Sequence, residues 1–197
     1  MSLMDQLMEV ASSQITKQAA EKTGLAEGMA AKMMPMALSA IMGGLKKNAA
    51  SPQGAEALAS ALNKHDGGLL DNISQLGNAD ILNDGQKMLG HILGGNQQVA
   101  EETIAKAAGG VSTSQAKDLM AMIAPVVLAS LGKAKKEQGL DISALAGLVQ
   151  NEGAQAQQKA GSELSGLMAM LDADGDGDIK DEALGIGKKL LGGLFKR

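Results

Sequence analysis

Acidic residues in the segment LDADGDGDIKDEA, residues 171–183, alternate with other residues in a pattern that suits cation binding. Asp172, Asp174 and Asp176 are spaced two residues apart, so a tight loop would point their carboxylates inward together. Gly177 follows them at the place where such a loop must turn sharply. Oxygen ligands in this arrangement are typical of sites for hard cations. The spacing therefore predicts a loop folded around one cation.

The segment resembles the first eight positions of an EF-hand calcium loop, with the Asp178 carbonyl at the seventh position and Ile179 at the eighth. It departs at the twelfth position, where the EF-hand glutamate is replaced by Ala183. The closing ligand would then come one or two residues early and weaken the site. We expect weak to moderate Ca²⁺ binding, with Mg²⁺ as an alternative ion, at Asp172, Asp174, Asp176, Asp178, Asp181 and Glu182.

A second interpretation of the loop is an acidic, solvated turn in which Asp181 caps the last helix. The segment HDGGLLDNI, residues 65–73, shares the frame D-G-x-[I/L]-x-D with the loop, so this turn has a structural use of its own. The earlier copy has Leu62 and Lys64 in place of the first two aspartates, and we expect it to be metal-free. Both interpretations of the later loop stay open on the sequence alone.

The rest of the chain must supply the elements that position this loop. Alanine, leucine, methionine and glycine dominate the 197 residues, and β-branched residues are sparse. This composition predicts an all-α, compact multi-helical bundle. The absence of cysteine excludes disulfides and thiol chemistry. The net charge of -4 and the lack of Trp and Tyr argue against a nucleic-acid partner.

Two segments resemble each other, GLAEGMAAKMMPMALSAIMGGLKKN from Gly24 and GVSTSQAKDLMAMIAPVVLASLGKAKK from Gly110. Each contains one proline, Pro35 or Pro125, which should kink a helix or begin one after a break. Both segments are apolar nearly all round, so we place them at the centre of the bundle. The expected organisation is a helical domain over 1–150 with related units at about 14–62 and 100–148, a polar linker over 151–161, and a helix–acidic loop–helix over 162–197.

Local signals predict where three of the helices begin. Ser51-Pro52 is a cap followed by a first-turn proline, Ser112 and Gln115 form a capping box, and Asp141 precedes an apolar stripe. The polar linker, NEGAQAQQKAG, has no apolar stripe, so it is either flexible or a solvated helix.

The chain resembles the YidB-like family of bacterial proteins, a domain of unknown function. The resemblance rests on ALSAIMGGLKKNAASPQGAEALASAL, HDGGLLDNI, GHILGGNQQ and LDADGDGDIKDEALG, and it covers nearly the whole chain. It implies a compact all-helical domain. It implies no activity, substrate or catalytic residue.

Candidates for catalysis are few. His91 lies on or beside an apolar helix face and is expected to be packed or interfacial, whereas His65 lies in a turn and is expected to be solvated. Two histidines without cysteine make a zinc site improbable on composition. Neither histidine is accompanied by a nucleophile or base motif, so we expect no enzymatic activity.

Methionines crowd the two repeated segments. The favoured interpretation is a soft, gap-filling core, and the alternative is an adaptable apolar surface for a protein partner. The residues concerned are Met29, Met33, Met34, Met36, Met42, Met120 and Met122.

The two ends of the chain bear on location. The start, MSLMDQL, shows no signal peptide, so we expect a cytoplasmic protein. The longest apolar stretch, residues 119–131, is too short for a transmembrane segment. The basic tail, GKKLLGGLFKR, allows weak contact with a membrane surface.

The sequence thus favours a non-enzymatic calcium-binding helical protein with a structural or partner-binding role. Two alternatives remain, a lipid-surface or envelope-associated module and an enzyme with an unrecognised site.

Overall fold

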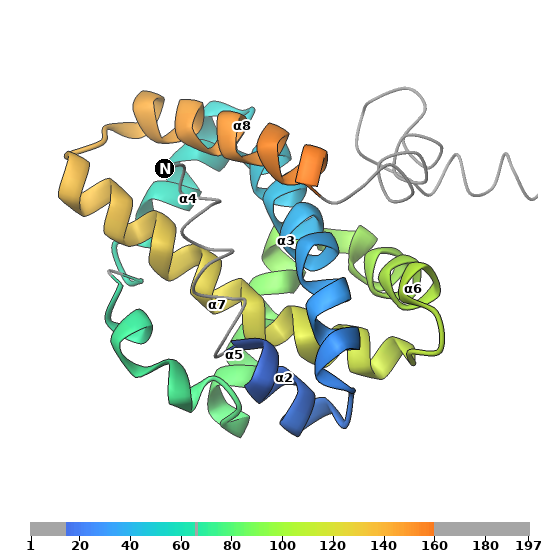
Figure 1. Cartoon of the computed structure of the whole chain (residues 1–197). Helices are drawn as coiled ribbons and strands as arrows, with labels where there is room; N and C mark the ends of the chain where they lie inside the picture. The colour runs from blue at the N-terminus through green and yellow to red at the C-terminus, as the bar shows by residue number, and fades with distance from the viewer. Residues whose placement is uncertain (1–14, 66, 160–197) are drawn as a thin grey trace, which may run out of the picture.

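The computed structural model describes residues 15–65 and 67–159, which form a bundle of α-helices (Figure 1). The α-helices are α2 (Thr16–Thr23), α3 (Glu27–Ala49), α4 (Pro52–Leu62), α5 (Ala79–Leu93), α6 (Gln97–Ala108), α7 (Thr113–Gln138) and α8 (Ile142–Lys159). Two 3₁₀-helices, η2 (Gly68–Gln75) and η3 (Gly94–Asn96), join α4 to α5 and α5 to α6. No strand occurs in these ranges, so the predicted all-α class is confirmed.

The two repeated apolar segments form α3 and α7, which lie at the centre of the bundle (Figure 1). Every residue of α7 from 119 to 132 is buried, as is every residue of α3 from 36 to 42. This burial on all sides confirms the central position predicted from their apolar composition. The helix α8 packs along α3, and α5 packs along α7.

Pro35 and Pro125 both lie inside continuous α-helices, so the alternative in which a helix begins after a break is wrong at both places. A proline inside a helix leaves the carbonyl four residues earlier without its usual donor. For Pro125 this is the Ala121 carbonyl, and the backbone of α5 lies directly against it at Gly85. A Cβ added to Gly85 would lie 1.9 Å from the Ala121 oxygen. The backbone of α5 thus packs directly against the carbonyl that Pro125 leaves without its usual donor.

The order of a short helix, a proline-containing helix and a third helix occurs twice, as α2–α3–α4 and as α6–α7–α8. The two units are joined reciprocally at helix ends. Lys32 of α3 donates to the carbonyl of Ala108, the last residue of α6, at 2.9 Å. Gln115 of α7 donates to the carbonyl of Thr23, the last residue of α2, at 3.0 Å. The structural equivalence of the two prolines stays a prediction.

The three predicted helix starts are confirmed. The Ser51 hydroxyl accepts from the backbone N–H of Gly54 at 3.1 Å. Ser112 and Gln115 form both bonds of a capping box. The Asp141 carboxylate accepts from the backbone N–H of Ala144 at 2.8 Å. Each bond satisfies a backbone donor that the first turn of a helix leaves without a partner.

Residues 151–159, the main part of the predicted linker, continue α8 as a helix. The sequence left two alternatives, a flexible linker and a solvated helix. The structure shows a helix here, and it is only partly exposed to solvent. Glu152, Gly153 and Ala156 are buried. A Cβ on Gly153 would lie 3.4 Å from the Met42 carbonyl of α3, so small residues bring the two helices close together.

Gly85 offers a direct test of the contact between α5 and α7. We expect Gly85→Ala to destabilise the fold by about 1–3 kcal/mol, because the added methyl meets backbone rather than a flexible side chain. Gly147→Ala is the matched control, since Gly147 is exposed within α8 and has no neighbour within 4 Å of an added Cβ. It should stabilise the protein by up to about 1 kcal/mol through helix propensity. Urea denaturation measures both changes, and equal effects at the two glycines would contradict the close approach.

Candidate functional site

The predicted metal ligands lie outside the residues that the structure describes. They are Asp172, Asp174, Asp176, Asp178, Asp181 and Glu182. Within the described ranges, no three His, Asp or Glu side chains are grouped so that they could hold a metal ion.

The earlier copy of the D-G frame is described from Gly67 onwards. Gly67 has a φ of 104°, in the region that favours glycine, and its carbonyl accepts from the backbone N–H of Leu70 at 2.9 Å. The 3₁₀-helix η2 begins at the next residue. The glycine of this frame therefore makes a sharp turn that leads directly into a helix.

His65 differs from its expected environment, and His91 differs from the packed one of its two expected environments. His65 is half-buried rather than solvated, because its backbone packs on α7 where a Cβ on Gly132 would lie 1.8 Å from the His65 oxygen. His91 is exposed rather than packed. The buried face of α5 is formed by Gly85, Leu89 and Ile92, and His91 points away from this stripe. The His91 and Ile92 carbonyls each accept from the Asn48 amide at 3.2 Å, so this end of α5 is tied to α3.

The methionines of the repeated segments belong to the core. Six of the seven are buried, and Met29 is partly buried against the same cluster. They therefore fill the interior, as the favoured interpretation predicted, and do not form the apolar partner surface that the sequence also allowed. The buried members are Met33, Met34, Met36, Met42, Met120 and Met122.

Two carboxylates that the sequence analysis missed are buried, Glu101 of α6 and Glu152 of α8. Glu101 of α6 is only 5% exposed, and its carboxylate accepts from the Gln97 amide at 2.8 Å. The same amide donates to the Gln86 side chain of α5 at 3.3 Å, and Gln86 donates to the Lys117 carbonyl of α7 at 3.3 Å. The network joins three helices by hydrogen bonds, so its arrangement suits a structural role. Its signal was present in the sequence, because position 101 lies on the same helical face as the buried residues Ile104, Ala105 and Ala108.

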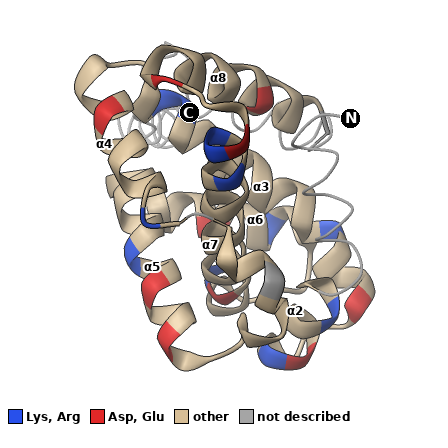
Figure 2. Ribbon diagram, turned by 90° about the vertical axis from the view of Figure 1, so that its left-hand side faces the viewer, with Lys and Arg blue, Asp and Glu red and all other residues tan. Residues whose placement is uncertain are grey.

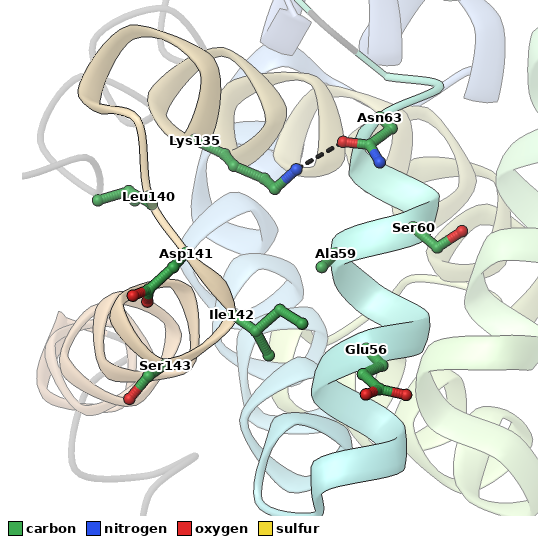
Figure 3. Close-up of a pocket in the computed structure, with 9 residues that line it drawn as sticks. All are labelled: Glu56, Ala59, Ser60, Asn63, Lys135, Leu140, Asp141, Ile142 and Ser143. Atoms are coloured by element: carbon green, nitrogen blue, oxygen red, sulfur yellow. Dashed lines mark hydrogen bonds between the residues drawn. The ribbon is translucent and has the colours of Figure 1, made fainter.

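A shallow, open groove of about 700 Å³ lies between α4 and the turn that joins α7 to α8 (Figure 3). Its surface is mostly apolar. Ile142 points across the groove toward Ala59 of α4, and Lys135 donates to the Asn63 side chain at 2.5 Å above them (Figure 3). The groove is lined by Glu56, Ala59, Ser60, Asn63, Lys135, Leu140, Asp141, Ile142 and Ser143.

The charges around the groove are unequal. Glu56 and Asp141 are both exposed there, and neither forms an ion pair with another described residue. The Lys135 ammonium is the only cation of the lining, and it is directed to the neutral Asn63 amide. Elsewhere basic and acidic positions are interspersed along the helices (Figure 2). The groove thus combines an apolar floor with an excess of one carboxylate.

The described fold and this groove define an α-helical bundle protein with a filled core and a shallow surface groove. Residues 5–134 match the family described as bacterial protein of unknown function (DUF937), and the chain belongs to this family. The match supports the expectation of a bacterial domain of unknown function. It does not show the expected YidB-like family. It also ends before the acidic loop, so it says nothing of an EF-hand. No curated protein and no solved structure matches the chain.

Among helices in the described part of the chain, only α7 is long and apolar enough to cross a membrane by length and composition. In the structure, 83% of its most apolar window is buried inside the bundle. The apolar character of α7 is therefore explained by its place in the core.

The groove predicts a contrast between neighbouring residues of α8. Ile142 is 42% exposed and Leu145 is 1% exposed. Ile142→Ala should change the free energy of unfolding by no more than about 0.5 kcal/mol, because little buried surface is lost. Leu145→Ala should cost about 2–5 kcal/mol, because it leaves a cavity in the hydrophobic core. Denaturation of both variants checks the assignment, and equal losses at the two positions would contradict it.

Proposed function

We propose that this protein is a non-enzymatic, calcium-binding helical protein with a structural or partner-binding role in the cytoplasm. The observation that carries the proposal is the spacing of Asp172, Asp174, Asp176 and Gly177, which supplies alternate carboxylates before a glycine turn. Calcium is preferred as the ion because it accepts many oxygen ligands in flexible geometry. Mg²⁺ is the alternative ion, and it ranks second because it demands a stricter arrangement of its ligands.

The turn at Gly67 supports this proposal indirectly. Gly67 and Gly177 occupy the same place in the shared D-G frame, and Gly67 has a positive φ and leads into a helix. A loop with the same turn at Gly177 would bring the three preceding aspartates to one side. The earlier copy lacks two of these acids, so the extra carboxylates of the later copy call for a separate explanation.

Charge repulsion gives the cation a structural role. Closely spaced carboxylates repel one another more strongly as the loop is ordered, and a bound divalent cation removes this cost. Binding to the folded loop alone would stabilise that fold by mass action. The cation would then hold together the helices expected on either side of the loop.

Titration of the metal-free protein tests calcium binding. We expect calcium to release heat or take it up in calorimetry and to raise the melting temperature. Asp172→Ala with Asp176→Ala should abolish both responses, because two of the alternate ligands are lost. The same double change should leave the stability of the metal-free protein unchanged or slightly higher, since it relieves repulsion.

The matched control is Glu21→Ala with Glu137→Ala, which removes two exposed acids of the bundle and should preserve the calcium response. Magnesium is titrated in parallel to separate the two ions. Absence of both heat and thermal shift at millimolar calcium would return the loop to the alternative interpretation, a capped and solvated turn.

A further inference from the structure

The groove between α4 and the α7–α8 turn has an apolar residue that the described structure leaves uncovered. Ile142 is the one large apolar side chain that is exposed among the described residues. Leu140 and Ala59 extend the apolar surface around it, and the carboxylates of Glu56 and Asp141 lie at its edge. The groove therefore suits a short segment that carries both apolar groups and positive charge.

The end of this chain has that chemistry. Residues 188–197, KKLLGGLFKR, contain four cations and no acid. They also contain three leucines and Phe195, the only aromatic residue of the protein. The apolar groups match the groove floor, and the cations match its excess of one carboxylate. The tail is thus complementary to the groove in both hydrophobicity and charge.

The chain is long enough for this contact to form within one molecule. The 18 residues of α8 separate the groove from the end of that helix by about 27 Å, at a rise of about 1.5 Å per residue. From Lys159 to Leu190 there are 190 - 159 = 31 residues, which can span on the order of 100 Å when extended. A tethered segment also has an effective concentration of up to about millimolar. Even weak docking would therefore be substantially populated, without an external partner.

We propose that the basic tail, residues 188–197, docks in the groove of its own chain, with Phe195 against Ile142 and the cations beside Glu56 and Asp141. Docking covers the exposed apolar surface and returns the end of the chain to the start of α8. The acidic loop at 171–183 lies between α8 and the tail in sequence. If the tail docks, both ends of the segment that contains this loop are held by the bundle. The docking does not depend on cation binding, because its complementarity comes from the groove and the tail alone.

Cysteine cross-linking tests the docking cleanly because the protein has no native cysteine. One variant carries Ser143→Cys in the groove lining and Gly193→Cys in the tail. The matched control carries Ser114→Cys with the same tail change, since Ser114 is exposed in the first turn of α7, far along that helix from the groove. Both are oxidised mildly at low protein concentration in EDTA and resolved on non-reducing gels. We expect an intramolecular disulfide several-fold more abundant in the groove variant than in the control.

Two further changes distinguish specific docking from random collision. Adding Phe195→Ser or Ile142→Ser to the groove variant should reduce the disulfide to the control level, and higher salt should also lower it. Ile142 is partly exposed, so melting temperatures are expected to show that the Ile142→Ser protein remains folded. Hydrogen exchange at the amides of 142–145 gives a second measurement, with slower exchange expected in the native chain than in the Phe195→Ser chain.

Several results would overturn the proposal. Equal cross-linking in the groove variant and the control would show that the tail is not held at the groove. Covalent dimers without the intramolecular product would assign the groove to a second copy. Cross-linking that is insensitive to both serine substitutions would exclude the apolar contact. A tail that leaves the groove unprotected but binds vesicles containing anionic phospholipid, dependent on Phe195, would instead be a membrane contact.

Discussion

The burial of α7 on every side is the constraint on which the rest of the structure depends. A helix that is apolar around its whole circumference must be surrounded, and α2, α3, α4, α5 and α6 all contact it. With one Phe and no Trp or Tyr in the chain, few large side chains are available to fill the spaces between helices. The helices therefore approach closely, and the interior is filled by alanine, leucine and methionine. Glycine is required where backbone meets backbone, as at Gly85 and Gly132.

Helix ends impose the second constraint, because the last carbonyls of each helix need donors. The bundle supplies several of these donors from neighbouring helices rather than from the same segment. Lys32 binds the end of α6, Gln115 binds the end of α2, and Asn48 binds the end of α5. These bonds join residues far apart in the sequence. They fix the relative positions of helices whose apolar contacts alone are non-directional.

Much of the fold follows from local sequence signals. The caps at Ser51, Ser112 and Asp141 and the central position of the two apolar segments could all be predicted, because they depend on local hydrogen bonds and on apolar composition. The continuity of the helices through Pro35 and Pro125 could not be predicted, since an interior proline is compatible with a kinked helix and with a break. Exposure of His91 was also misjudged, because a residue at the edge of an apolar stripe can lie on either side of it.

The candidate sites divide in the same way. The acidic loop was recognisable because its spacing is local, and it remains a prediction because its residues lie outside the described ranges. The groove could not be foreseen, since its two walls come from α4 and from the α7–α8 turn, which are distant in sequence. Glu101 was missed, although it lies on the same face of α6 as the buried residues Ile104, Ala105 and Ala108. In the structure, the Gln97–Glu101 hydrogen bond is partly buried and the Gln98–Glu102 hydrogen bond is exposed.

The family match and the hydrophobic core do not end at the same residue. The residues matched to the family end at 134, within α7, whereas α8 begins at Ile142 and packs along α3. One side of α3 is therefore shielded from water by residues that follow the family match. The family match thus ends before the hydrophobic core is complete, and a fragment cut at residue 134 would expose the side of α3 that α8 covers.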